Sequence, residues 1–290
     1  MTGDERMPYG FIRHIENKGY SLETVKSYEK VINHFFKYIK KSYPLNKEPF
    51  QISPTDIRNY MEEQLEQDKS ISTVNKELAI IKTFFHYLWE INKVPFDPAV
   101  KIKRLKLEKE LTIIITYEEI LSILEKVLSN HEYSKLRKAV FLLAVKGLKT
   151  ADFRFKKEDV LDEFEDNYLI IQLKNRSITL RDIEATCFRE YYDEAMFSEN
   201  DYVFTTTPHG EHSGGPIQVM SILNHLRAIS SEYLGENHQP LTLILIRRSI
   251  ALYMYLKQYP LQIIAKELGI EENSASNYLK YITQSTLIQK

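Results

Sequence analysis

The sequence is poor in the residues that build disulfide-rich, metal-rich or fibrous proteins. A single cysteine, Cys187, among 290 residues excludes an internal disulfide framework and a multi-cysteine metal site. Nine glycines and ten prolines exclude a collagen-like or linker-dominated chain. No apolar run approaches the roughly 18 residues that a membrane helix requires, and the polar N-terminus MTGDERMPYG does not resemble a signal peptide. These absences predict a soluble protein of the cytoplasm.

Aromatic residues and an uneven charge distribution are what the chain does have. Nineteen tyrosines and 14 phenylalanines supply material for a core, and a length near twice ~150 residues favours two domains. Residues 1–107 carry 18 Lys and Arg against 14 Asp and Glu, whereas residues 108–290 carry 21 against 26. The basic N-terminal part favours a nucleic-acid partner, although a lysine-rich solvated surface explains the same excess.

Apolar residues recur at helical spacing through the first 99 residues. The predicted helices cover residues 9–19, residues from Ser21 to before Pro44, residues from Ser53 onward, and residues from Ser72 to before Pro95. Serine, or serine followed by proline, is a typical helix start. We therefore predict a four-helix domain over residues 1–99. The charged, glycine-free stretch 100–110 is interpreted as a basic linker or extended arm, and an exposed helix end fits it equally.

Residues 111–290 are predicted to form a second, mostly helical domain with one small antiparallel ribbon. Residues 168–172 and 177–180 are strand-like, and Lys174-Asn175-Arg176 forms a tight turn between them. Helices are expected from Thr116 and over residues 136–148, 184–197, 216–234, 243–257, 260–268 and 272–283. The fold class is thus mainly α with two domains.

One local pattern and one pair of histidines suggest further sites. Residues 261–279 have a small residue, a glycine and a second apolar stripe at helix-turn-helix spacing, although Glu271 and Glu272 would face phosphate unfavourably. His209 and His212 share a loop, but no third ligand accompanies them. We therefore predict no metal and no cofactor.

The order of these segments resembles the tyrosine recombinases, the phage integrase family. GYSLETVKSY (19–28), ISTVNKELAIIKTFFHYL (71–88) and FDPA (96–99) resemble two helices and the closing Asn-Pro of the family's core-binding domain. ITYEEILSIL (115–124) resembles the helix that opens its catalytic domain. The resemblance implies a SAM-like N-terminal domain and a recombinase-type C-terminal domain that together hold duplex DNA.

The family's active site contains two arginines, a lysine, two histidines (or a histidine and a tryptophan) and a tyrosine. Its G-L-R-x-x-E motif is GLKTAD here, so Lys149 stands at the first arginine and Asp152 matches the acid. Lys174 in the ribbon turn matches the lysine, and Arg247 in ILIRRS keeps the second arginine.

The histidines are replaced and the tyrosine is retained. The family's H-x-L-R-H-T and L-G-H motifs place Ile244 and Ile270 at the two histidine positions. Tyr278 falls at the nucleophile, and Tyr281 is the fallback. Isoleucine can neither donate nor accept a hydrogen bond, and losing one charge-stabilising donor costs ~10²–10³ in rate. Lysine at position 149 lacks the planar fork of arginine, and Arg154 is an alternative source of that charge.

These replacements lead us to expect a DNA-binding protein that has lost strand exchange and acts as a phage or mobile-element regulator, such as a repressor, or as an accessory factor. Three alternatives stay open at this point. The acidic C-terminal part also fits a scaffold that binds only proteins, and the other two alternatives bind DNA. One is an active site-specific recombinase using Tyr278, and the other is a helix-turn-helix regulator that reads DNA through residues 261–279.

Double-stranded DNA is the predicted partner. The predicted contacts are Lys26, Ser72, Thr73, Asn75, Lys76 and Lys82 in the first domain, Lys101, Lys103, Arg104 and Lys106 in the linker, and Lys149, Arg247 and Arg248 in the second domain. In the family a terminal helix docks on the neighbouring protomer, so residues 279–290 are expected to mediate self-association on DNA.

Overall fold

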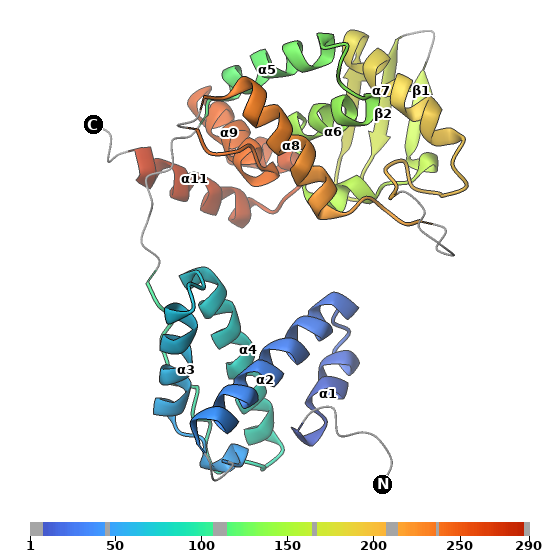
Figure 1. Cartoon of the computed structure of the whole chain (residues 1–290). Helices are drawn as coiled ribbons and strands as arrows, with labels where there is room; N and C mark the ends of the chain where they lie inside the picture. Colours follow the sequence, from blue (N-terminus) through green and yellow to red (C-terminus); the bar gives the residue numbers. More distant parts are fainter. Residues whose placement is uncertain are drawn as a thin grey trace. The chain divides into compact units, whose positions relative to one another are not determined.

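The computed structural model describes residues 8–43, 47–106, 115–163, 167–206, 214–235 and 238–286. The chain divides into two compact units, Met1–Lys109 and Glu110–Lys290 (Figure 1). The described residues are mainly helical with one small antiparallel sheet. This architecture confirms the predicted fold class.

The described residues of the N-terminal unit form a bundle of four α-helices. They are α1 (Phe11–Asn17), α2 (Leu22–Ser42), α3 (Pro54–Glu66) and α4 (Ile71–Glu90), with short 3-10 turns at Pro8–Gly10 and Pro49–Gln51. The hydroxyl groups of Ser21, Ser53 and Ser70 accept hydrogen bonds from first-turn amides of α2, α3 and α4. Helix α4 therefore begins at Ile71 with Ser70 as its cap, and not at the predicted Ser72.

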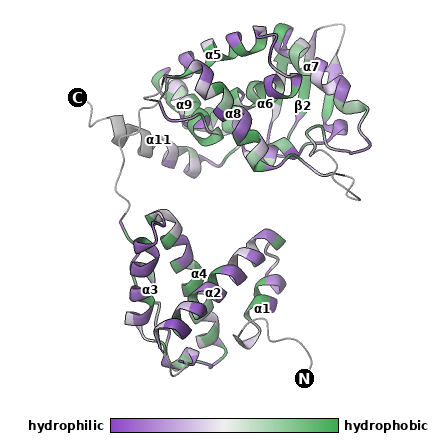
Figure 2. Cartoon of the chain, viewed as in Figure 1, coloured by the Kyte–Doolittle hydropathy of each residue, from purple (hydrophilic) through white to green (hydrophobic). Residues whose placement is uncertain are grey.

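The core of this unit consists of the apolar stripes that the sequence predicts, with aromatic rings such as Phe35, Phe84 and Phe85 fully buried. Figure 2 shows hydrophobic and hydrophilic residues alternating along each helix. A polar network also crosses the bundle, since buried Glu77 accepts from the Tyr60 hydroxyl at 2.7 Å and from Lys69 Nζ at 2.6 Å. Paired in this way, the buried carboxylate does not carry the penalty of an isolated charge.

The described part of the C-terminal unit contains seven helices and a three-stranded sheet, and α7 packs on the sheet. The helices are α5 (Tyr117–Ser129), α6 (Lys135–Val145), α7 (Asp182–Met196), α8 (Val219–Tyr233), α9 (Leu243–Leu256), α10 (Leu261–Leu268) and α11 (Glu272–Thr286). Two 3-10 turns, Thr150–Arg154 and Lys157–Asp159, lead from α6 to the sheet. No described helix is both long enough and apolar enough to cross a membrane.

The sheet has one strand more than the predicted ribbon. Strands β1 (Val160–Glu163), β2 (Tyr168–Gln172) and β3 (Ser177–Arg181) pair antiparallel in the order β1-β2-β3. In β2 and β3 the side chains alternate, so that Leu169, Ile171, Ile178 and Leu180 face the core. Strand β1 escaped prediction because VLDE is too short and too polar to show that alternation.

Helix α6 is the centre of the unit. Every residue from 138 to 145 is buried, because α5, α7, α8 and α9 all pack against this helix. Such a helix is apolar all round rather than amphipathic. Its C-terminal end leads directly into residues 146–149, where the GLKTAD motif begins.

Candidate functional site

The candidate site forms where the C-terminal ends of α6 and α10 meet the middle of α9. Arg247, on α9, is only 2% exposed. One terminal nitrogen of its guanidinium donates to the carbonyl of Gly147 after α6, and the other donates to the carbonyl of Leu268 at 2.8 Å. Helix C-termini carry unpaired carbonyls and partial negative charge. A buried guanidinium is therefore stabilised here without a hydrogen-bonded carboxylate among the described residues.

Arg176, which the sequence interpretation treated only as a turn residue, reaches the same place from the sheet. Its Nη2 donates to the Lys146 carbonyl at 2.9 Å, one residue before the carbonyl that Arg247 binds. Burial lowers the pKa of the Arg176 guanidinium, the carboxylate of Glu267 opposes this shift, and the charge of Arg247 adds to it. No local pattern singles out Arg176, because its role depends on a residue 71 positions away along the chain.

Lys149 and Lys174 lie at the edge of this region. Lys149 caps the 3-10 turn Thr150–Arg154: its amide donates to Asp152 at 3.1 Å, and its Nζ lies 3.9 Å from the other Asp152 oxygen. Its ammonium is thus partly neutralised by the acid of its own motif. Lys174 is exposed in the β2–β3 turn, and Arg154 is exposed at the end of the 3-10 turn.

The two isoleucines and the tyrosine occupy different environments. Ile244 is 56% exposed in the first turn of α9, whereas Ile270 is half-buried against the core. Tyr278 is half-buried on α11, which packs on both α9 and α10. Tyr281 also lies in α11, but its side chain falls outside the described side chains.

The helix-turn-helix pattern of residues 261–279 corresponds to α10 and α11. Gly269 ends α10 with φ +58°, a left-handed conformation that suits glycine. Ala265 and Ala275 are buried between the helices. Glu271 and Glu272 are exposed at the start of α11, where they would repel a phosphate backbone.

The predicted DNA-contacting residues of the N-terminal unit meet along α4. Both amide atoms of Asn75 bind the main chain of Leu105, at 2.9 and 2.8 Å, and Lys82 Nζ donates to the Val100 carbonyl at 3.2 Å. The first part of the predicted linker therefore packs along α4 instead of standing free. Asn75 and Lys82 hold that segment in place, whereas the sequence predicted only that they contact DNA.

The remaining predicted contacts are mostly at the surface. Exposed residues are Lys26 on α2, Ser72, Thr73 and Lys76 at the start of α4, and Lys101, Lys103, Arg104 and Lys106 in the segment beside it. Thr73 also takes part in the cap, since its amide and hydroxyl both bond to Ser70. Arg248 is half-buried next to Arg247.

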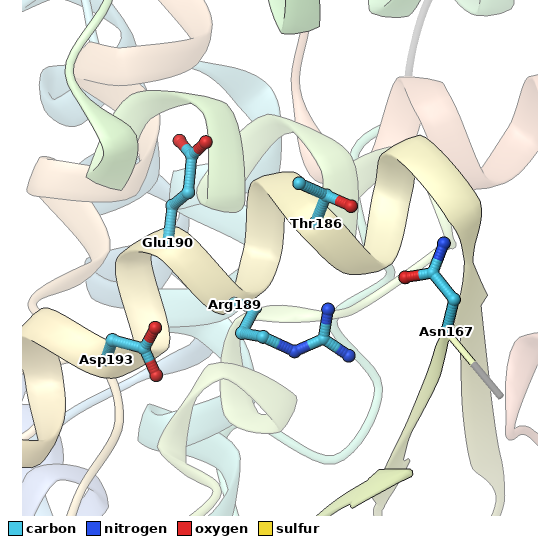
Figure 3. Close-up of a pocket in the computed structure, with 5 residues that line it drawn as sticks. All are labelled: Asn167, Thr186, Arg189, Glu190 and Asp193. Atoms are coloured by element: carbon cyan, nitrogen blue, oxygen red, sulfur yellow. The ribbon is translucent and has the colours of Figure 1, made fainter. Parts of the chain in front are cut away.

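The described residues offer no competing chemical site. No cluster of three potential metal ligands occurs among them. His209 and His212, for which we predicted no metal site, lie outside the described residues. A hollow of about 430 Å³ beside α7 is lined by polar side chains (Figure 3). Its Arg189 makes a two-point ion pair with Asp162 at 2.7 and 2.9 Å, and its Glu190 and Asp193 are acidic. An acidic hollow with a neutralised arginine does not suit a phosphate.

Comparisons with known proteins agree with this arrangement. Residues 10–91 match the family model described as "Phage integrase, N-terminal SAM-like domain". The tyrosine recombinase XerD of Listeria innocua is 26% identical over 289 residues, which covers 94% of this chain and 92% of the relative. A putative tyrosine recombinase of Caldanaerobacter subterraneus is 25% identical over 276 residues, covering 94% and 91%.

Solved structures share the fold across nearly the whole chain. The Tn1549 transposon integrase in complex with a circular intermediate DNA has a TM-score of 0.69 at 15% identity, and 92% of each chain is covered. A lambda integrase dimer bound to a core site has a TM-score of 0.64 at 18% identity, again with 92% of each chain covered.

These findings correct our prediction of a regulator that has lost strand exchange. The relatives that span the chain are named recombinases, so the alternative of an active recombinase fits better. The prediction was wrong because it let three replaced side chains decide the function, whereas relatives that match 94% of the chain are named recombinases. These comparisons show that residues 10–91 match the N-terminal SAM-like domain of phage integrases and that the chain is similar to tyrosine recombinases over 94% of its length.

Proposed function

We propose that this chain is a site-specific tyrosine recombinase that cuts duplex DNA with Tyr278. The observation that carries the proposal is the similarity to XerD-type recombinases over 94% of the chain. Two further features support it. Arg247 stands at a family arginine position, and Tyr278 stands on a helix that packs against the helix of Arg247.

The proposed reaction conserves the number of phosphodiester bonds. The Tyr278 oxygen attacks phosphorus and passes its proton to solvent water, and the bond from phosphorus to the 5′ oxygen breaks. The leaving oxygen takes a proton from Lys174, which regains one from solvent. The product is a 3′-phosphotyrosyl ester with a free 5′ hydroxyl. Attack by the 5′ hydroxyl of another strand releases Tyr278 and completes the exchange. Because one ester replaces another at each step, no energy-rich cofactor is required.

Duplex DNA is the proposed partner of both units. In the N-terminal unit we propose that the start of α4 and the segment beside it face the phosphates, since four basic residues lie in residues 101–106. Such contacts position a protein without reading sequence. Asn75 then acts by holding the segment and not by touching a base. A protein that acts on the cell's DNA is expected in the cytoplasm.

We also propose self-association on DNA through residues 279–290. An apolar hollow of about 340 Å³ lies between α9, α10 and α11, and Tyr255, Tyr259, Leu261 and Ile264 form much of its lining. Leu279 and Lys280 border it, so the proposed segment starts beside an apolar surface. Light scattering with and without DNA tests this; a strict monomer on DNA contradicts it.

A covalent-trapping assay tests the proposed chemistry. Duplexes from the DNA that flanks the chain's own gene carry a nick close to each candidate cleavage point, so that the short cleaved strand diffuses away and the phosphotyrosyl adduct accumulates. The wild-type chain should give an adduct that resists denaturation in detergent. Tyr278→Phe should give none, because the nucleophilic oxygen is missing.

Tyr281→Phe is the matched control, since it removes a hydroxyl from the same helix. It should leave the adduct intact. If the adduct forms with Tyr278→Phe but not with Tyr281→Phe, the nucleophile is Tyr281. A duplex that is retained in a gel shift without any adduct would overturn the proposed cleavage.

A further inference from the structure

Arg176 enters the site through a passage that two glycines keep open. A Cβ placed on Gly269 would lie 3.2 Å from Arg176 Cδ and 3.4 Å from its Nε, and a Cβ on Gly147 would lie 3.6 Å from its Nη2. Both glycines have positive φ, +58° and +79°. The Arg176 side chain thus extends from the β2–β3 turn to the ends of α6 and α10. Any residue larger than glycine at position 269 would crowd this side chain.

Two guanidinium groups then share one short stretch of main chain. Arg176 binds the Lys146 carbonyl and Arg247 binds the next one, that of Gly147. No described carboxylate hydrogen-bonds to either arginine. Glu267 and Asp152 act on Arg176 only through space. Two neighbouring cations whose hydrogen bonds go to main-chain carbonyls favour the binding of an anion.

Arg176 also retains unused hydrogen-bonding capacity. Its Nε is buried and has no hydrogen-bond partner in the described part of the chain, although a guanidinium has five N–H donors. Arg176 is half-buried, whereas Arg247 is 2% exposed. Of the two, Arg176 is the more accessible to an incoming phosphate.

Resting on the proposed function, we propose that Arg176 supplies the second guanidinium for the nonbridging oxygens of the scissile phosphate. It replaces the arginine whose position Lys149 occupies. Lys149 is ill suited to this task, because its ammonium lacks a fork and lies 3.9 Å from Asp152. The site then keeps two planar guanidinium groups, one from α9 and one from the sheet.

A charge-neutral substrate separates this role from a structural one. In a methylphosphonate linkage, a methyl group replaces one charged oxygen, so the cation that would bind that oxygen is no longer needed. Arg176→Ala should slow adduct formation on the ordinary phosphodiester about 100-fold or more. On the methylphosphonate substrate the loss relative to wild type should fall below about tenfold. An equal loss on both substrates would mean that Arg176 only caps α6.

Two further variants make the result interpretable. Arg176→Lys keeps the positive charge and one donor for the Lys146 carbonyl, so this variant should fold. It loses the planar fork of arginine, so its cleavage of the phosphodiester should be at least about tenfold slower than that of wild type. If the alanine variant does not fold, this variant decides, and unchanged cleavage by it refutes the inference. Arg181→Ala is the control from β3, the strand that follows Arg176. Arg181 is exposed, and its guanidinium lies over the Tyr168 ring at 5.5 Å, so its removal should leave cleavage unchanged.

Binding without cleavage separates this inference from the proposed nucleophile. In a Tyr278→Phe background, removing one phosphate contact should reduce the slope of log K against log salt by about 0.9. Arg176→Ala should do this and Arg181→Ala should not. If wild type forms no adduct but the slope still falls, the nucleophile fails and the phosphate contact stands. If Arg176→Ala leaves both slope and cleavage unchanged, Arg176 fails and the nucleophile stands.

Discussion

Asp56 is the residue whose replacement should most clearly destabilise the N-terminal unit. Its side chain is 3% exposed and accepts hydrogen bonds from the Ser53 amide at 2.8 Å, from Lys47 Nζ at 2.9 Å to both oxygens, and from the Tyr43 hydroxyl. It thus completes the capping box of α3 and joins that helix to the segments before it. Asp56→Asn removes the negative charge and leaves Lys47 without its partner.

The expected cost follows from these contacts. A hydrogen bond to a charged group contributes about 1.5–3 kcal/mol, and breaking a buried ion pair on one side costs about 3–5 kcal/mol. Because asparagine still accepts one bond, we expect a loss of about 3 kcal/mol at pH 7. With a urea dependence near 2 kcal/mol per molar, the unfolding midpoint should fall by about 1.5 M.

The pH dependence has a definite sign. Burial raises the pKa of Asp56, but the bonds from Tyr43, Ser53 and Lys47 outweigh it, and the folded pKa lies below the ordinary value. The contribution of the carboxylate is therefore complete above the unfolded pKa and is lost as the pH falls through the folded one. The difference between wild type and variant should be constant from pH 5 to pH 7 and should shrink below about pH 4.

Trp89, the single tryptophan of the chain, provides the assay. It lies on α4, so its fluorescence during urea unfolding of the full chain reports the N-terminal unit. Glu66→Gln, which changes an exposed acid on the same helix as Asp56, should leave the midpoint unchanged. A loss below about 1 kcal/mol for Asp56→Asn, or a difference that does not shrink in acid, would refute the reasoning.

Three other replacements test the site and the DNA-contacting surface. Arg247→Gln should lower the thermal midpoint in circular dichroism and abolish the covalent adduct, since it leaves two buried carbonyls unpaired at a cost of about 3 kcal/mol; normal stability would contradict this. Gly269→Ala should lower the free energy of unfolding by about 1–2 kcal/mol, because the backbone at this position is left-handed, and should slow cleavage by displacing Arg176. A more stable chain with normal cleavage would show that Arg176 does not need the space beside Gly269. Asn75→Ala should weaken DNA binding in a salt titration, because the segment at Leu105 loses both of its bonds to α4, and unchanged affinity would show that this segment does not contact DNA.

The helices and their order were determined by the sequence. Apolar stripes with a period of 3.6, and serine or threonine caps such as Ser21, Ser53 and Thr116, act within a few residues. Such local signals do not depend on how the rest of the chain packs. They predicted the four-helix unit and the mainly helical second unit, and the order of the motifs along the chain was enough to indicate the family.

Tertiary structure alone decided how the site is assembled. Strand β1 exists because it pairs with β2, and its own four residues carry too weak a pattern. The pairing of Asn75 with Leu105 and the meeting of Arg176 with Arg247 join residues 30 and 71 positions apart. The sequence showed that Lys149 is not an arginine, but only the packing of α6, α9, α10 and the sheet placed another guanidinium nearby. Contacts of this kind depend on how whole elements pack together, and no local spacing encodes them.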